Sequence, residues 1–202
     1  MDHTKEFFDG YADRWDDVNR YDQPQEVFKR LVTALGIKEG SKVIDLGCGT
    51  GIFIPYLLEA VGSSGLIYAV DVSDKMLKRL SQKFRAQNIR PFSLKAEELS
   101  KIDDKVDAVL CFSTFPHIDD KRKAVKEIST VLKPMGRFLI AHFSSREEIN
   151  NFHTGLSEPI CLHVLPDESL MRETLNKCGF KIINFIDKPS QYELLAERSD
   201  YV

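Results

Sequence analysis

The sequence lacks several features that would place it in other classes of protein. No apolar run approaches the roughly 20 residues that a membrane-spanning helix needs. The polar N-terminus, Met1–Glu6, has no apolar core of the kind a signal peptide carries. The four cysteines form no C-x-x-C pair, which favours reduced thiols over disulfides or a redox motif. These absences predict a cytoplasmic protein with no membrane partner.

A basic surface is also missing from the composition. The 28 lysines and arginines are outnumbered by 31 aspartates and glutamates, and no basic cluster is interleaved with aromatic residues. Because nucleic-acid binding relies on excess positive charge near the phosphates, we expect no nucleic-acid partner. A chain of 202 residues with 43% hydrophobic residues is long enough to bury the core of one globular domain.

The most informative stretch is Val43–Gly51, an apolar strand that runs into a turn with three glycines at alternate positions. Such a turn lets a ligand approach the main chain where a Cβ would clash, and it is a nucleotide-site element of doubly wound α/β folds. Ile52 stands where the dinucleotide fingerprint requires glycine, and Asp45 would repel a phosphate but attract an ammonium group. The turn therefore favours a ligand without a pyrophosphate.

Strands and helices alternate along the rest of the chain. Apolar runs predict strands over 42–46, 66–70, 92–95, 106–112, 137–143, 181–186 and 191–197. Helical periodicity predicts helices over 4–19, 24–35, 51–61, 73–87, 120–132 and 167–177. Asp71 ends the second strand 20 residues beyond Gly51, the spacing at which a carboxylate meets ribose hydroxyls in such folds.

The stretch Val43–Gly51 resembles motif I of the class I S-adenosylmethionine-dependent methyltransferases. The resemblance is to the small-molecule type, which includes ubiquinone and menaquinone biosynthesis enzymes. Phe8–Asp16 resembles the N-terminal lid segment of that family, and Ala96–Leu99 the segment that borders the adenine, with Lys95 in place of its acidic residue. Lys133–Gly136 resembles a lysine-proline-glycine-glycine turn, with Met135 in place of the first glycine.

The resemblance implies a Rossmann-like, doubly wound α/β fold. It implies a seven-stranded, mostly parallel sheet with an antiparallel C-terminal hairpin and helices on both faces. We expect a single methyltransferase domain over 1–202: an N-terminal helical lid (1–36), a cofactor-binding core (37–143), a substrate-side insertion (144–165), and a C-terminal helix and hairpin (166–202).

The resemblance also implies the cofactor, S-adenosyl-L-methionine, with S-adenosyl-L-homocysteine as product. The residues it assigns to the cofactor are Tyr11, Asp45, Gly47, Cys48, Gly49, Gly51, Asp71, Val72, Met76, Ala96, Glu97, Cys111 and Phe112. Core packing is an equal alternative for Met76, and packing of an accessory helix for Tyr11.

A sulfonium is already an activated leaving group, so methyl transfer needs positioning and, where the acceptor arrives protonated, a base. Histidine titrates near neutral pH, and the candidate bases are His117, His142 and His153. A metal held by His142, His153, Cys161 and His163 is an alternative, although their spacing matches no standard zinc signature.

The leading hypothesis is an enzyme that moves a methyl group from S-adenosylmethionine to a small-molecule acceptor. The alternatives are a non-catalytic S-adenosylmethionine-binding regulatory or scaffold protein, and a nucleotide-dependent α/β reductase. The sequence leaves the acceptor and the oligomeric state open.

Overall fold

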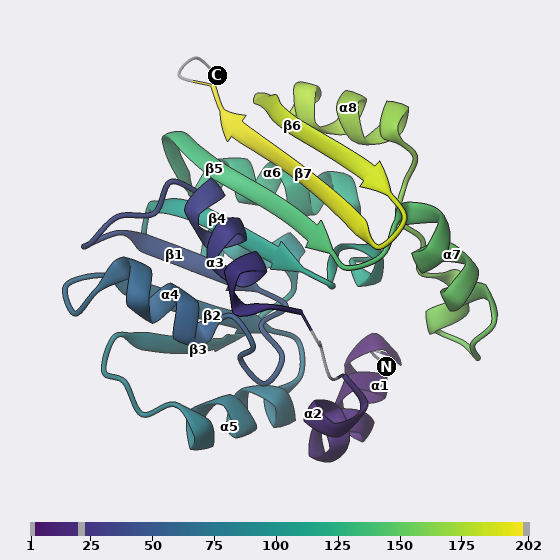
Figure 1. Ribbon diagram of the computed structural model, residues 1–202, viewed down its shortest axis with the longest axis horizontal. Helices are drawn as coiled ribbons and strands as arrows, with labels where there is room; N and C mark the ends of the chain where they lie inside the picture. Colours follow the sequence, from purple (N-terminus) through teal and green to yellow (C-terminus); the bar gives the residue numbers. More distant parts are fainter. Residues whose placement is uncertain (1–2, 20–22, 200–202) are drawn as a thin grey trace.

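The computed structural model describes residues 3–19 and 23–199. Seven strands form one sheet in the order β3-β2-β1-β4-β5-β7-β6 (Figure 1). The first five are β1 (Lys42–Leu46), β2 (Leu66–Asp71), β3 (Ile89–Ser93), β4 (Val106–Phe112) and β5 (Leu132–His142), and all their pairings are parallel. β7 (Gln191–Arg198) is antiparallel to both β5 and β6 (Phe180–Lys188). The predicted sheet and its C-terminal hairpin are confirmed.

Helices cover both faces of this sheet, because each strand alternates apolar side chains between two separate cores. One core joins the sheet to α3 (Gln25–Ala34), α4 (Ile54–Val61) and α5 (Asp74–Lys83). The other joins it to η2 (Ala96–Lys101), α6 (Lys121–Val131) and α8 (Glu168–Lys177). Since both faces are covered, we expect a ligand site at the ends of the strands.

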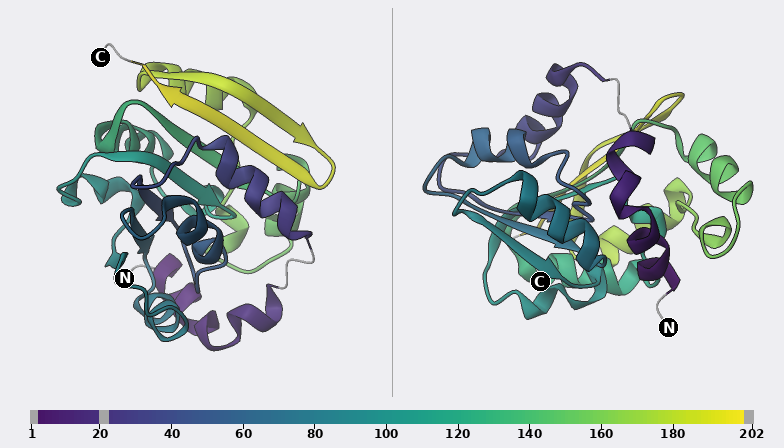
Figure 2. Two further views of the ribbon diagram at one scale, coloured as in Figure 1. Left: turned by 60° about the vertical axis from the view of Figure 1, so that its left-hand side comes forward. Right: turned by 90° about the horizontal axis from the view of Figure 1, so that it is seen from below.

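The N-terminal segment lies apart from these two layers. It consists of α1 (His3–Tyr11), the short η1 (Ala12–Arg14) and α2 (Trp15–Val18), where the periodicity predicted one helix. This segment, called the lid below, packs against α5 at the carboxyl ends of the parallel strands (Figures 1 and 2). The helix α7 (Arg146–Thr154) lies at the same ends of the strands. Open α/β sheets bind ligands at the carboxyl ends of their parallel strands.

Several element boundaries differ from the sequence prediction. β3 begins at Ile89, three residues before the predicted start, and α5 ends at Lys83 instead of residue 87. β5 begins at Leu132, so the expected turn at 133–136 lies inside an irregular strand in which Met135 has a positive φ of 61°. The aperiodic insertion contains α7, whose start is fixed by a reciprocal capping box between Ser145 and Glu148. Short η3 (Phe115–His117) and η4 (Ile160–Leu162) complete the elements.

Side chains cap the starts of α5 and α6. Ser73 accepts a hydrogen bond from the backbone N–H of Met76 at 3.1 Å, and Asp120 accepts one from Lys123 at 2.9 Å. Within the described ranges, no helix combines the length and the apolar character that crossing a bilayer would require.

Candidate active site

The glycine turn after β1 is held tightly against its neighbours. The backbone N–H groups of Gly47 and Cys48 both donate to the carbonyl of Val70, at 2.7 and 3.0 Å. Gly47 has a φ of 70°, and a Cβ there would overlap the Thr114 side chain. At Gly51, with a φ of 96°, a Cβ would lie 2.7 Å from Phe84 Cε2. The turn therefore requires glycine both for its backbone and for its close contacts.

Asp71 is fixed at the end of β2 by two backbone donors. Its Oδ2 accepts from the N–H of Gly49 and its Oδ1 from the N–H of Ser73, both at 2.9 Å. The residue is only 9% exposed. Burial, with a smaller contribution from Asp9, raises the pKa of Asp71 to about 6, against the lowering effect of the two backbone donors. Each carboxylate oxygen keeps a lone pair that can accept from a ligand hydroxyl.

Asp45 lies deeper, within β1. It is 2% exposed, and its Oδ2 has no hydrogen-bond partner among the described residues. Burial first, and then the nearby Asp71 carboxylate, raise the pKa of Asp45 to about 7. A buried carboxylate oxygen without a partner is costly, so this site favours a proton or a cationic ligand group.

A cavity of about 340 Å³ opens over the turn. It is within the range of small-molecule sites, about 300–1,000 Å³. The structure brings together ten of the thirteen residues assigned to the cofactor: Gly47, Cys48, Gly49, Gly51, Asp71, Val72, Met76, Ala96, Glu97 and Phe112 all line this cavity.

The other three assigned residues do not line the cavity. Asp45 and Cys111 are buried in their strands, and burial raises the pKa of the Cys111 thiol. Tyr11 lies against the ring of Phe7, at 4.8 Å between centroids, and beneath the Arg14 guanidinium. The aromatic residues of the lid that line the cavity are Phe8 and Trp15.

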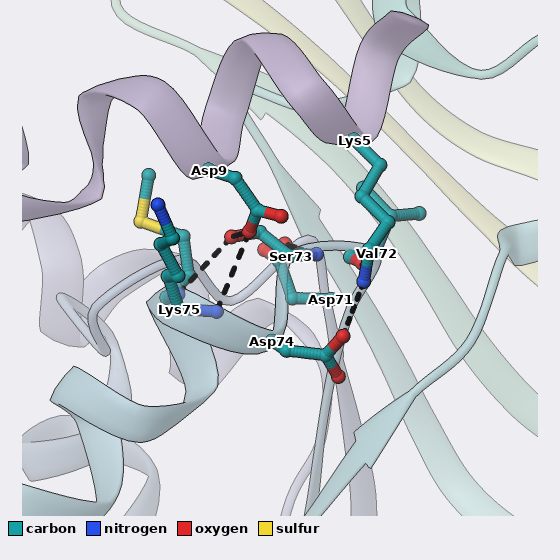
Figure 3. Close-up of polar contacts among 8 residues, drawn as sticks. Lys5, Asp9, Asp71, Val72, Ser73, Asp74 and Lys75 are labelled. Carbon is teal, nitrogen blue, oxygen red and sulfur yellow. Dashed lines mark hydrogen bonds and ion pairs between the residues drawn. The ribbon is translucent and has the colours of Figure 1, made fainter. Parts of the chain in front are cut away.

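The lid is fastened to the start of α5 by polar contacts (Figure 3). Ser73 Oγ donates to Asp9 Oδ1 at 2.5 Å, and the N–H of Lys75 approaches the same oxygen at 3.4 Å. Lys5 Nζ donates to the carbonyl of Val72 at 3.1 Å and pairs with Asp74. These contacts join residues more than 60 positions apart, directly beside Asp71.

The second half of the lid meets the glycine turn itself. Thr50 Oγ1 donates to Asp16 Oδ1 at 2.5 Å, and Asp16 also pairs with Lys83 of α5. A Cβ at Gly49 would lie 3.3 Å from the indole nitrogen of Trp15. The lid therefore forms one wall of the cavity.

At the adenine side expected from the resemblance, charged groups are already paired. Lys95 Nζ pairs with Asp119 at 3.0 Å, and Glu97 Oε1 accepts from the N–H of Asp120 at 2.8 Å. Both Lys95 and Glu97 line the cavity. Glu97 is therefore held in place by the start of α6.

Four of the five histidines form a cluster around His117. Nδ1 of His117 lies 2.9 Å from Nδ1 of His163, and Nδ1 of His153 lies 2.5 Å from the carbonyl of His163. The rings of His117 and His153 are 5.0 Å apart. Of these histidines only His117 lines the cavity. Burial, and then the neighbouring histidines, lower the pKa of His117 well below its ordinary value.

The two other candidate bases lie behind His117. His142 is buried, its Nε2 has no hydrogen-bond partner among the described residues, and burial lowers its pKa to about 3. His153 is 7% exposed. Among residues 3–19 and 23–199, no group of three or more histidine, cysteine or acidic side chains is arranged to hold a metal ion.

Comparisons with known proteins agree with this geometry. A family model described as "Methyltransferase domain" matches residues 44–140. The ubiquinone/menaquinone biosynthesis C-methyltransferase UbiE of Klebsiella pneumoniae subsp. pneumoniae is 31% identical over 188 residues, which cover 79% of this chain and 74% of that one. The UbiE of Cronobacter sakazakii is 29% identical over 188 residues, with the same coverages of 79% and 74%.

Among solved structures, magnesium protoporphyrin IX methyltransferase from Synechocystis, with bound S-adenosylhomocysteine, has the same fold. It aligns with a TM-score of 0.72 at 20% identity, over 98% of this chain and 100% of that chain.

Proposed function

Since this chain belongs to the class I S-adenosylmethionine-dependent methyltransferases, we propose that its acceptor is a small molecule that binds beside His117. The observation that carries the proposal is the cavity of about 340 Å³, whose lining includes the glycine turn, Asp71 and His117. The relatives named for ubiquinone and menaquinone biosynthesis support an acceptor of metabolite size.

The residues present fit the cofactor. The glycine turn forms a cradle that Cβ atoms would fill, and Asp71 presents a buried, oriented carboxylate to it. We assign the amino-acid end to the turn and the ribose hydroxyls to Asp71. The buried, unpartnered Asp45 carboxylate lies beneath the turn and supplies negative charge for the ammonium group without lining the cavity. Ala96 and Glu97 then border the adenine, with Met76 beside them.

When bound, the cofactor supplies a methyl group on a positively charged sulfur, which is already activated. The chain's own contribution is to orient it, to exclude water and to accept a proton from the acceptor. The lid excludes water through Phe8 and Trp15, and we assign the proton to His117 because it alone of the candidate bases lines the cavity.

Charge and cysteine content support the remaining assignments. The net charge of −3 supports an acceptor other than nucleic acid. Cys48, Cys111, Cys161 and Cys178 are all unpaired, which supports a reducing, cytosolic site of action. We further propose that the chain acts as one domain, with 144–165 as the substrate-side insertion. Of the residues 1–36 expected as a lid, we assign that role to α1, η1 and α2, because α3 packs in one core of the sheet.

Transfer of a labelled methyl group from S-adenosylmethionine into a fractionated metabolite extract tests the acceptor class. Label in a low-molecular-weight fraction is expected, and label only in protein or nucleic acid would refute the proposal. A protein that binds the cofactor but labels nothing would favour the regulatory alternative.

Cofactor binding can be measured independently. Trp15 is the only tryptophan of the chain and lines the cavity, so its fluorescence should change on titration with S-adenosylhomocysteine. Asp71→Ala should weaken that binding about tenfold to a few hundredfold, because charged hydrogen bonds contribute about 1.5–3 kcal/mol each. Unchanged affinity by calorimetry would overturn the ribose assignment.

A further inference from the structure

His117 and His163 form a pair that crosses a wall between two cavities. His117 lines the cavity over the glycine turn, and His163 lines a second cavity of about 410 Å³. The cavities are adjacent, because both are lined by the same four residues: Thr4, Lys95, Ile118 and Asp119. The 2.9 Å contact between the two Nδ1 atoms therefore connects one cavity to the other.

The chemistry of this contact is restricted. Two imidazole Nδ1 atoms at 2.9 Å share a single proton, so one ring donates and the other accepts. The only hydrogen bond of the His117 ring is this one, since Nε2 has no partner among the described residues. The Nε2 of His163 is likewise without one. Each ring thus has a second nitrogen with no hydrogen bond to the described residues.

We propose that His163 is a positioning residue that fixes the tautomer of His117 and passes the acceptor's proton to the second cavity. The proposal rests on the methyl transfer proposed above. In the starting state His117 carries its proton on Nδ1 and presents the Nε2 lone pair to the acceptor, while His163 carries its proton on Nε2.

The transfer is balanced in protons. When the acceptor loses its X–H proton, that proton binds His117 Nε2, and the Nδ1 proton of His117 moves to Nδ1 of His163. His163, now an imidazolium, releases its Nε2 proton to water in the second cavity. The X–H bonding pair stays on the acceptor atom, and each transferred proton binds the lone pair of the nitrogen that receives it. Proton exchange with water at the two Nε2 atoms then restores the starting tautomers.

The surroundings favour positive charge on His163 over His117. His117 is the more deeply enclosed ring, with a pKa well below the ordinary value because of burial and the neighbouring histidines. Burial and Lys121 also lower the pKa of His163, but the Asp119 carboxylate opposes that lowering. The groups that face the pair are His142, His153, Lys121 and Asp119.

This arrangement narrows the acceptor to molecules that give up a proton from the atom that is methylated, or from one conjugated to it. An acceptor already deprotonated, or one with a free lone pair, would make no use of His163.

The first test needs no acceptor. In protein labelled with ¹⁵N-histidine and saturated with S-adenosylhomocysteine, NMR should show Nδ1–H on His117, Nε2–H on His163 and scalar coupling across the shared bond. A proton on Nε2 of His117, or the absence of coupling, would overturn the proposal. This readout is independent of turnover, so it tests the His117–His163 hydrogen bond even if the wild-type protein methylates nothing. The absence of methylation would refute only the proposed function.

The second test uses the metabolite fraction that accepts the label. His163→Asn keeps a hydrogen-bonding group near Nδ1 but cannot carry a proton, so its kcat should fall at least tenfold while the KM for S-adenosylmethionine stays unchanged. In His163→Gly, added imidazoles should restore kcat in proportion to their basicity. His3→Asn is the matched control, since His3 lines the same second cavity without contacting His117. Wild-type kcat in His163→Asn, or rescue independent of basicity, would show a purely structural pair.

Discussion

Asp45→Asn tests whether the buried carboxylate beneath the glycine turn holds a proton in the cofactor-free protein. Asp45 is 2% exposed with an unpartnered Oδ2, and burial with the nearby Asp71 raises its pKa to about 7. Asparagine has almost the same shape but does not titrate. The difference in unfolding free energy between variant and wild type therefore reports the titration of Asp45 together with its interaction with Asp71.

The sign and size follow from proton linkage. Below about pH 4 both the folded and the unfolded wild-type chains hold the Asp45 proton, so its contribution is constant there. Between about pH 4 and 7 the unfolded chain releases the proton first, and the wild-type protein becomes less stable as pH rises. A rise in pKa from 3.8 to about 7 corresponds to about 4 kcal/mol, at about 1.36 kcal/mol per pKa unit.

The variant should therefore gain about 4 kcal/mol relative to wild type between about pH 4 and pH 8, a shift in Tm of about 8–16 °C. Urea unfolding without cofactor, followed by circular dichroism over this pH range, measures the difference. Asp103→Asn, at an exposed position, controls for the loss of a carboxylate from both states. A difference that stays constant with pH would refute the protonated state of Asp45.

The same variant separates stability from binding. If the negative charge of Asp45 stabilises the cofactor's ammonium group, cofactor binding to the wild type below about pH 7 must release the Asp45 proton. The affinity of wild type for S-adenosylhomocysteine should then rise as pH approaches 7, and that of Asp45→Asn should be weaker and independent of pH over this range. Equal affinities would remove Asp45 from the cofactor site.

Three substitutions test the backbone features of the fold by chemical denaturation. Gly47→Ala should cost about 2–4 kcal/mol, because its φ of 70° disfavours a Cβ and that Cβ would overlap Thr114. Gly10→Ala is the control, since a Cβ at that helical position meets nothing within 4 Å and should stabilise by about 0.5–1 kcal/mol. Met135→Gly should stabilise by about 1 kcal/mol, because it relieves a left-handed backbone at an exposed side chain; a loss of stability would contradict this.

The central strands were the most predictable part of the fold. β1 and β4 begin and end where the sequence predicts, since buried parallel strands are short apolar runs bounded by turn residues. The sequence predicts the start of β5 too late, because Pro134 and Gly136 indicate a turn. In the structure Met135 adopts a left-handed φ inside an irregular strand. Local sequence contains no sign of that conformation at a methionine.

The candidate site was predictable where its residues are local in sequence. Gly47–Gly51 and Asp71 line the cavity as expected, because a strand-to-helix turn and its neighbouring strand fix them. The sequence does not predict that His163 contacts His117, since the two lie 46 positions apart and the pattern around His163 indicates only a possible metal ligand. Such a pairing depends on how the insertion folds back over the sheet, which residue spacing does not encode.

The lid shows why the glycine turn by itself is only part of the site. The Ser73 hydroxyl caps α5 and donates to Asp9, and the Ser73 N–H donates to the Asp71 carboxylate. One residue thus links the lid, the helix and the carboxylate assigned to the ribose. Placing Asp9 beside Asp71 raises the pKa of Asp71, and Lys5 supplies positive charge at the same point of the structure. Asp71 also accepts a hydrogen bond from the N–H of Gly49, so the position of the lid affects the turn. Substitutions of Lys5 or Asp9 should therefore alter cofactor affinity although they leave the glycines unchanged.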